Sequence, residues 1–442
     1  MITQKFLINR FGERGAYIAK SFTASFAARI FGLIFSILIT PMMLDYLGNE
    51  NYGLWTVLIS FSGFLAFSDF GLSAGLLNFI LKYKNEMDKV EKAISSTFWF
   101  LTVTSVSLII LLISGSYFLD WGSFFNTNIN NVNSLVRIVI LLFLINIPFS
   151  IIQKIQFGFL QNHIYHLWEV VQKITLILFI IIGIQLQLNL FALIIGYYLI
   201  FILINLSNLL IYGSKNKHIQ LNKIILNKLQ IDQPIFNQIF KTGFLFLLMN
   251  LTYVLGRSSN KLIISYWGSL ENVTEYDILL KPFEIFMVFI MMFTGTLWSA
   301  FGDALQKKDF MWIQKIIKKS FLFIAIGVLI ITTVMIFYGN NILEIWLGNK
   351  YDFNANYYLV LGIWTLILAL SNVFSALLNA GNYLKFQIVT FLIYGIISFF
   401  CKIYGLIHFG LFGFIMLNTI TYFLIILIPD IIKYKKIKHE IY

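Results

Sequence analysis

Residues 240–266 read FKTGFLFLLMNLTYVLGRSSNKLIISY, an apolar stretch that is long enough to cross a membrane as a helix. Two cations, Arg257 and Lys261, stand four residues apart in it, and Asn250 lies seven residues before Arg257. Four residues make about one helical turn, so this spacing predicts that the three side chains share one face. A cation at bilayer depth is costly, which predicts that Arg257 faces a wet interior cavity. Lys261 lies closer to the end of the span and could instead reach the membrane interface.

Apolar stretches of this kind recur along the whole chain. We count twelve and predict an all-α polytopic membrane protein. The composition agrees, because 59% of the residues are hydrophobic and only 12% are charged, about half the charged fraction of ordinary soluble domains. The only cysteine, Cys401, lies in one of these spans, so no disulfide within the chain is expected. The predicted spans are 21–44, 53–81, 94–118, 136–160, 168–186, 190–212, 240–266, 277–303, 320–338, 356–379, 384–404 and 408–429.

The connections between the spans alternate in charge. The two terminal segments and the second, sixth and eighth connections hold basic clusters, whereas the first and third connections hold no cation and the seventh is acidic. The positive-inside rule therefore predicts that both termini are cytoplasmic. The net charge of +12 is explained by this pattern, so nucleic acid is not the expected partner.

A weak internal repeat divides the chain into two halves. Tyr46-Leu47-Gly48 after the first span matches Tyr266-Trp267-Gly268 after the seventh, and Glu91-Lys92-Ala93-Ile94 matches Gln314-Lys315-Ile316-Ile317. Each half holds six spans, so both halves should have the same orientation and be related by a pseudo-two-fold axis along the membrane normal. The predicted domains are an N-terminal lobe, a cytoplasmic linker and a C-terminal lobe, at residues 1–212, 213–239 and 240–442.

Few other charges lie inside the spans of the first half. Arg29 belongs to a stripe of small and polar residues in the first span and is expected to face a cavity. Asp69 falls near the middle of the second span, four residues before Ser73. It could be an ion-pair partner of Arg29, a protonatable residue that couples transport to an ion gradient, or a structural anchor.

The eighth span carries three charged residues on one predicted helical face: Asp277, Lys281 and Glu284. Pro282 should bend the helix there. Glu284 is the deepest of the three charges. It could pair with a cation (Lys281, Lys261 or Arg257) or act in ion coupling.

Amide side chains form stripes in the fourth and tenth spans. Asn146, Gln153 and Asn379, together with Asn250, could hydrogen-bond sugar hydroxyls, or they could make contacts between helices. No glycine-rich phosphate loop and no zinc-protease helix occur in the sequence, and the connections are too short for a catalytic domain. No catalytic residue, metal or cofactor is therefore expected, and the chain is not predicted to be an enzyme.

Two motifs carry a resemblance to a known family. Residues 44–55, LDYLGNENYGLW, and residues 68–72, SDFGL, resemble the first connection and second helix of the bacterial O-antigen and capsular polysaccharide repeat-unit flippases. These belong to the polysaccharide biosynthesis proteins of the multidrug/oligosaccharidyl-lipid/polysaccharide exporter (MOP) superfamily. The likeness extends over the whole chain in its twelve spans, its two halves and its basic connections.

The resemblance implies a flippase, or antiporter, that moves undecaprenyl-diphosphate-linked oligosaccharide across the bacterial inner membrane by alternating access. It also implies a central cavity lined by cations, for which Arg29 and Arg257, with Lys261 and Lys281, are the candidates. Expected partners are membrane lipid and the polymerase and chain-length regulator of O-antigen, lipopolysaccharide or capsule synthesis. The superfamily favours a working monomer.

Three alternatives remain open from the sequence. A multidrug exporter of the same superfamily should present uncompensated carboxylates to its cargo, whereas the deep residues here favour positive charge. A peptidoglycan-precursor flippase usually has more than twelve helices. A membrane glycosyl polymerase or ligase needs a large external loop with catalytic Arg or His, and the connections predicted to lie outside are short.

Overall fold

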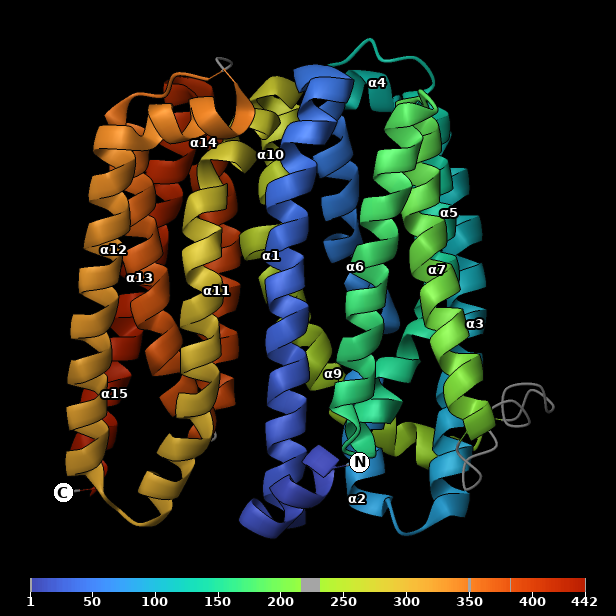
Figure 1. Cartoon of the computed structure of the whole chain (residues 1–442), viewed down its shortest axis with the longest axis vertical. Coiled ribbons are helices and arrows are strands. Elements are labelled where there is room, and N and C mark those ends of the chain that lie inside the picture. The colour runs from blue at the N-terminus through green and yellow to red at the C-terminus, as the bar shows by residue number, and fades with distance from the viewer. Residues whose placement is uncertain (1, 216–230, 349–350, 382, 442) are drawn as a thin grey trace. The chain divides into compact units, whose positions relative to one another are not determined.

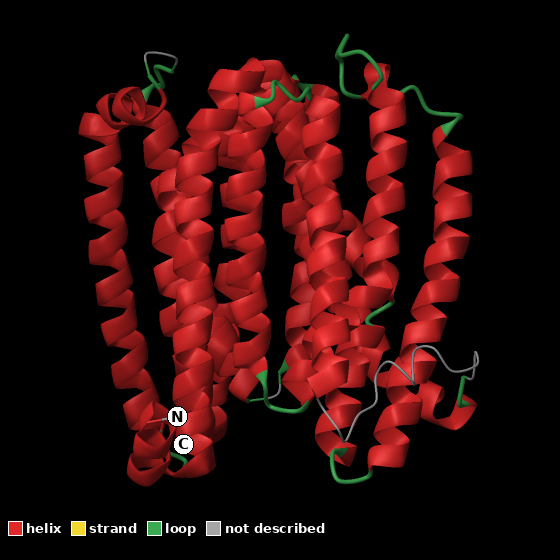
Figure 2. Ribbon diagram, turned by 45° about the vertical axis from the view of Figure 1, so that its right-hand side comes forward, coloured by secondary structure: helices red, strands yellow, loops and turns green. Residues whose placement is uncertain are grey.

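The computed structural model describes residues 2–215, 231–348, 351–381 and 383–441, and these residues are helical with short connections and no strand (Figures 1 and 2). For residues 2–22, 61–67, 245, 249–250, 253, 257, 299, 306 and 439–441 only the backbone is described. Residues 216–230 of the predicted linker lie outside the described part. The helical architecture confirms the predicted all-α class, which is the form that satisfies backbone hydrogen bonds inside a bilayer.

Within the described ranges, nine helical stretches are long and apolar enough to cross a membrane. Many large apolar side chains on their outer faces are exposed, as on α12 (Phe310–Leu347), where Leu322, Phe323, Ile326, Leu329 and Ile330 are all at least half exposed. Such surfaces suit contact with lipid tails. The chain is therefore a multi-pass membrane protein.

Two helices are too long for a single crossing. The first, α1 (Ile2–Leu65), has 64 residues, and a straight helix of that length would measure about 96 Å, three times the hydrocarbon thickness. Its backbone turns at Gly48, where φ is +74°. The other, α14 (Leu384–Tyr422), turns at Gly410, where φ is +62°. Each therefore holds parts of two predicted spans.

Two predicted spans are interrupted. The second consists of the end of α1, a 3-10 turn η1 (Ala66–Asp69) and α2 (Leu72–Tyr83). The seventh consists of α9 (Gln233–Tyr253), a π-helical turn η2 (Val254–Ser258) and α10 (Asn260–Trp267). With these breaks and the two turns, the helices account for the twelve predicted spans.

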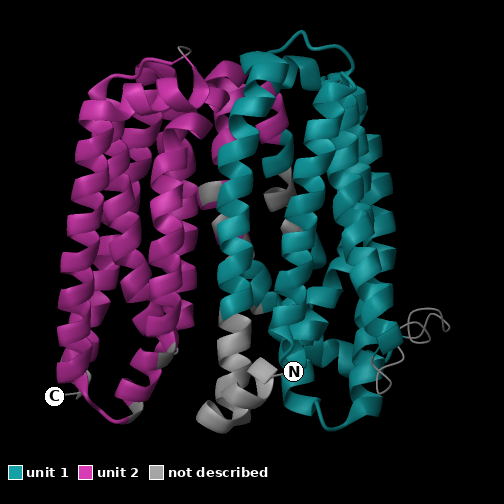
Figure 3. Ribbon diagram, viewed as in Figure 1, with its two compact units in different colours: residues 1–51, 58–250 teal, residues 52–57, 251–442 magenta. Residues whose placement is uncertain are grey.

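By packing, the chain forms two compact units, residues 1–51 with 58–250 and residues 52–57 with 251–442 (Figure 3). In the first unit, α5 (Val132–Gly158) packs against α2, α3 (Met87–Ser116) and α7 (Leu190–Lys215). Two further helices complete it, α4 (Trp121–Phe124) and α6 (Asn162–Gln185). The predicted lobe boundaries stay a prediction, because these units group residues by contact.

In the second unit, α13 (Ala355–Ala380) is the central helix and packs against α11 (Leu270–Gln306), α12 and α14. The chain ends with a π-turn η3 (Phe423–Leu427) and α15 (Ile428–Ile441). Helix α11 continues through Pro282. Phe301, Phe310 and Phe374 lie in a buried apolar core that joins these helices.

Candidate functional site

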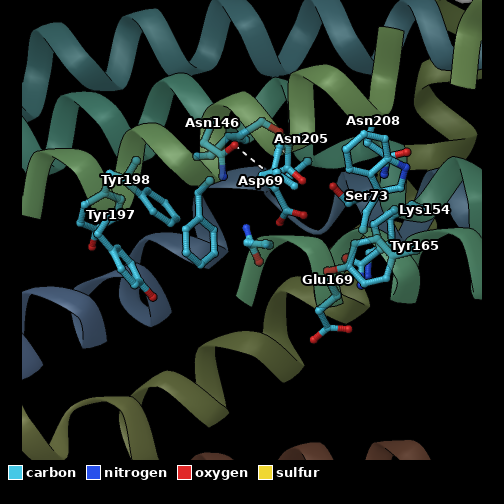
Figure 4. Close-up of a pocket in the computed structure, with 18 residues that line it drawn as sticks. Asp69, Ser73, Asn146, Lys154, Tyr165, Glu169, Tyr197, Tyr198, Asn205 and Asn208 are labelled. Atoms are coloured by element: carbon cyan, nitrogen blue, oxygen red, sulfur yellow. Dashed lines mark hydrogen bonds between the residues drawn. The ribbon is translucent and has the colours of Figure 1, made fainter. Parts of the chain in front are cut away.

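A polar cavity of about 400 Å³ lies inside the first unit (Figure 4). Its walls come from the η1–α2 break and from α5, α6 and α7, and they bring three predicted residues together, Asp69, Asn146 and Gln153. Lys154, Glu169 and Asn205 line it as well. A charged, amide-rich chamber inside an apolar bundle is expensive, which marks it as a functional feature.

The break in the second span places Asp69 at this cavity. Phe70 and Gly71 both have positive φ, +52° and +73°, so the helix cannot continue through them. Gly71 N–H donates to Asp69 Oδ1 at 2.8 Å, and Ser73 also hydrogen-bonds the carboxylate. A Cβ atom at Gly71 would lie 2.0 Å from the carbonyl oxygen of Gly243 in α9, so only glycine fits this close approach.

Amides pair with one another across the helices that form the cavity. Asn205 Nδ2 of α7 donates to Asn146 Oδ1 of α5 at 2.9 Å. Deeper in the same interface, Gln156 Nε2 donates to Asn208 Oδ1 at 2.7 Å. Asn146 therefore makes an interhelical contact and also lines the cavity. Its position is compatible with both predicted roles, a contact between helices and a hydrogen bond to a sugar hydroxyl.

The charges of the cavity are only partly balanced. Lys154 is the charged neighbour of Asp69, but no ion pair within 4.0 Å joins them. Glu169 Oε2 lies 3.1 Å from His166 Nδ1. The cavity thus offers both a cation and carboxylates to a bound molecule.

A second charged cluster lies in the second unit around Asp277, which is 5% exposed. Its Oδ1 accepts from Lys261 Nζ at 2.6 Å. Its Oδ2 accepts from Tyr52 OH at 2.9 Å and lies 3.3 Å from Lys281 Nζ. Two ammonium groups contact one carboxylate, and the charge of Glu284 acts on Lys281 from beyond 4.0 Å.

The ion-pair partners differ from those that the sequence suggested. Glu284 is exposed and forms no ion pair with the described cations, so its predicted pairing with Lys261 or Lys281 is wrong. The reason is position, because Asp277 lies one turn before Lys281 on α11 and also reaches α10. Arg29 is exposed on α1 and forms no ion pair with Asp69, so that alternative is wrong too.

The seventh span does not keep one α-helical register. The side chains of Asn250 and Arg257 lie outside the described residues, but the backbone of Arg257 belongs to the π-turn η2. A π-turn inserts about one extra residue into the helix. The backbone therefore does not keep one α-helical register from Asn250 to Lys261, and the predicted shared face of the three side chains stays a prediction.

Asn379 lies on α13 in the second unit. Its Oδ1 is buried and accepts no hydrogen bond among the described residues. Nδ2 of Asn372, seven residues earlier on the same face, is buried and has no acceptor among them. Buried amide atoms without partners are rare in native proteins. Its predicted glycan contact stays a prediction.

Sequence reasoning gave no functional role to three charged residues, of which only Lys154 belongs to a predicted stripe, the polar stripe of the fourth span. Lys154 lines the cavity, Lys402 of α14 is completely buried, and Asp430 of α15 is 2% exposed and accepts from Ser371 Oγ at 2.9 Å. Each is an ionisable residue within or at the end of an apolar span, and that signal could have identified all three.

At one end of the first unit a groove of about 880 Å³ is formed by the first, third and fifth connections. Tyr46 OH donates to the carbonyl oxygen of Leu188, and Thr127 Oγ1 donates to Glu50. Asn130, Asn131 and Gln187 line the groove, which contains no charged side chain. The odd-numbered connections of this half therefore meet at the same end, as the charge alternation requires.

The family model for polysaccharide biosynthesis protein matches residues 18–298 of this chain. No curated protein matches the sequence. Among solved structures, the chain is similar to an inward-facing multidrug resistance transporter of the MATE family of the MOP superfamily, with a TM-score of 0.72, 12% identity and 94% of each chain covered.

Two further solved structures are similar. The lipid II flippase MurJ, in an inward closed conformation, gives a TM-score of 0.68 at 16% identity, over 95% of this chain and 87% of that one. A MOP superfamily transporter from Pyrococcus furiosus, whose binding pocket is described as having reversed polarity, gives 0.64 at 13% identity, over 96% and 95%. At these identities the likeness shows the fold, the two-lobed fold of that superfamily.

Proposed function

Because this chain belongs to the polysaccharide biosynthesis protein family, we propose that it moves undecaprenyl-diphosphate-linked oligosaccharide repeat units across the bacterial inner membrane. Its fold is that of a MOP-superfamily transporter, and the similar solved structures are transporters and a flippase rather than enzymes. The headgroup crosses by alternating access, while the polyprenyl tail stays in lipid.

The two lysines around Asp277 are the observation that carries this proposal. Lys261 and Lys281 both contact one carboxylate and both stay partly exposed, while Glu284 lies beyond ion-pair distance, so an anionic headgroup can bind the two ammonium groups. Arg29, with no described ion pair, and Arg257 add to the positive charge of the spans. Hydrogen bonds between cations and phosphate are strong, and stronger where water is excluded.

The glycan needs a different chemistry, namely amides and hydroxyls that exchange hydrogen bonds with sugar hydroxyls. Asn146, Gln153 and Asn205 supply amides in the cavity of the first unit, and Tyr165 and Tyr197 supply aromatic surface beside them. Asp69 in the same cavity, and Glu284 in α11, are the candidates for binding the proton or sodium ion that drives the cycle.

The proposed setting follows from topology and family. Both termini lie in the cytoplasm, the lobes are residues 1–212 and 240–442 with the linker 213–239 between them, and one copy of the chain suffices for transport. The product is handed to a polymerase and its chain-length regulator in the assembly of O-antigen or another surface polysaccharide.

A multidrug exporter is the second candidate, because Asp69 and Glu169 share their cavity with several aromatic rings. Organic cations favour such sites. Lys154 stands in the same cavity and disfavours a cationic cargo. Efflux of ethidium from cells that express the chain separates the two, since a polysaccharide flippase should not increase it.

Replacement of the two arginines tests the proposal. Arg29→Gln and Arg257→Gln, made in the polysaccharide-producing host, should each lower the amount of surface polymer roughly tenfold. A tenfold effect is what the free energy lost with one charge-assisted hydrogen bond would produce. Lipid-linked repeat units should accumulate on the inner face of the membrane. Arg137→Gln is the matched control, because Arg137 is engaged with Ser116 and the ring of Tyr117. Normal polymer from both arginine variants, at wild-type protein level, would rule the proposal out.

A further inference from the structure

The π-turn η2 is an unusual element that carries its own hydrogen-bond pattern. Ser259 N–H donates to the carbonyl oxygen of Val254 at 3.0 Å, five residues back, and Ser259 Oγ donates to that of Leu255 at 2.7 Å. Single π-turns inside α-helices are rare and occur frequently at functional sites. Arg257 stands in the middle of this turn.

Lys402 of α14 reaches this turn from a neighbouring helix. Its side chain is 0% exposed, and its ammonium donates to Asn260 Oδ1 at 2.8 Å, to Gly256 O at 3.1 Å and to Ser259 Oγ at 3.4 Å. A lysine ammonium has three donors, so all three are used. No described carboxylate lies within 4.0 Å of it. The ammonium of Lys402 therefore hydrogen-bonds residues in the π-turn and directly after it.

Tyr394, also on α14, closes the turn from the same side. Its hydroxyl donates to Asn418 Oδ1 at 2.8 Å and lies 3.5 Å from Gly256 O. A Cβ atom at Gly256 would lie 2.8 Å from the Tyr394 ring, so the turn and the ring are in close contact. Asn260 Nδ2 donates in addition to Tyr276 OH of α11 at 2.9 Å.

From these contacts we infer that Lys402, assisted by Tyr394, is a positioning residue that holds the π-turn and so fixes the backbone of Arg257, the residue proposed above to bind the diphosphate. Lys402 donates hydrogen bonds to Gly256, which precedes Arg257 in the chain, and to Ser259 and Asn260, which follow it. It is fully buried, so it acts through Arg257 and not on the cargo. The second half of this inference rests on the proposed function.

A burial cost explains why a lysine stands at this position. An apolar residue would leave the oxygens of Gly256 and Asn260 short of a donor in an apolar lobe, which is costly. The turn would then relax toward a regular α-helix. The backbone of Arg257 would move with it, because one residue of register turns a helix by about 100°.

Hydrogen exchange of the full chain in lipid nanodiscs tests whether Lys402 stabilises the π-turn η2. Lys402→Met should speed amide exchange in residues 254–260 by roughly tenfold or more, the weight of a hydrogen bond to a charged group. The control is Lys385→Met, the same change at an exposed position of α14. Unchanged exchange in Lys402→Met would overturn the inference.

Should Lys402→Met fail to fold, Tyr394→Phe provides the second test. It removes only the hydroxyl that faces Gly256, so exchange in the same segment should rise, by less than for the lysine. Exchange at the wild-type rate in that variant would equally overturn the inference.

Binding of undecaprenyl diphosphate in the same nanodiscs tests the action through Arg257. Lys402→Met should weaken binding roughly tenfold in the wild-type background and little in an Arg257→Gln background, because coupled residues are not additive. Equal losses in both backgrounds would show that Lys402 acts independently and would overturn the inference. If Arg257→Gln alone binds normally while Lys402→Met still loosens the turn, the proposed function fails and the structural hold stands.

Discussion

The carboxylate of Asp277 is contacted by side chains from three segments, Lys261 of α10, Lys281 of α11 and Tyr52 of α1. The sequence predicted both lysines as intramembrane cations. It did not predict which acid they share, because Asp277 and Glu284 lie on one face of the same helix at seven-residue spacing. Only the packing of α10 against α11 decides between them.

Asp277→Asn should be destabilising, because it leaves two partly buried ammonium groups without the carboxylate that they contact. Removing one partner of a buried ion pair typically costs about 3–5 kcal/mol. Asp303→Asn is the control on the same helix, since Asp303 and Lys307 form an exposed pair with side chains 62% and 69% exposed. Thermal unfolding in detergent checks both. Similar midpoints for the two variants would contradict the structure at Asp277.

Among the elements, the broken second span is where sequence patterns gave the least guidance. Hydropathy located the span correctly, since Ala66 to Leu72 is apolar apart from Ser68 and Asp69. It could not locate the break, because hydropathy is averaged over about nineteen residues and does not resolve a turn of four or five. The same is true of η2, so hydropathy predicted the spans but not the turns inside them.

Gly71→Ala should disrupt the first unit at this break. The new Cβ would meet the Gly243 carbonyl at 2.0 Å, and a φ of +73° costs an L-residue about 1–2 kcal/mol before any clash. Gly115→Ala in α3 is the control, since nothing lies within 4 Å of its Cβ position. Yield and melting temperature of the purified variants measure the difference. A Gly71→Ala chain as stable as wild type would show that α2 and α9 do not approach so closely.

For the whole molecule, the charge of the connections predicted a topology that the first unit supports. The first, third and fifth connections, none of which holds a cation, meet in one groove, and a hydrogen bond from Tyr46 to Leu188 joins two of them directly. Charge counting needs no knowledge of packing, so the sequence alone yields an orientation, and which end is cytoplasmic stays a prediction. The cavity around Asp69 could not be predicted from sequence, because its walls come from segments 140 residues apart.

Labelling of single cysteines should verify the orientation. In a Cys401→Ser background, Asn130→Cys in the third connection should react with a membrane-impermeant maleimide in spheroplasts. Lys84→Cys in the second connection should react only after the membrane is permeabilised. Both positions are exposed, so access to reagent is the same apart from the membrane. Reaction of Lys84→Cys in intact spheroplasts would show that the second connection lies outside the cell, which is the reverse of the predicted orientation.

Helix α1 contributes to both compact units, because Tyr52–Val57 packs with the second unit and the residues on either side pack with the first. A Cβ atom at Gly53 would lie 2.1 Å from the carbonyl oxygen of Leu270, which shows how tightly that segment is seated. The chain passes between the two units at three peptide links, Asn51–Tyr52, Val57–Leu58 and Asn250–Leu251. If the proposed transport cycle rotates one unit against the other, the backbone dihedral angles that change lie at these three links. Stiffening them should then slow the cycle without changing which residues contact the cargo.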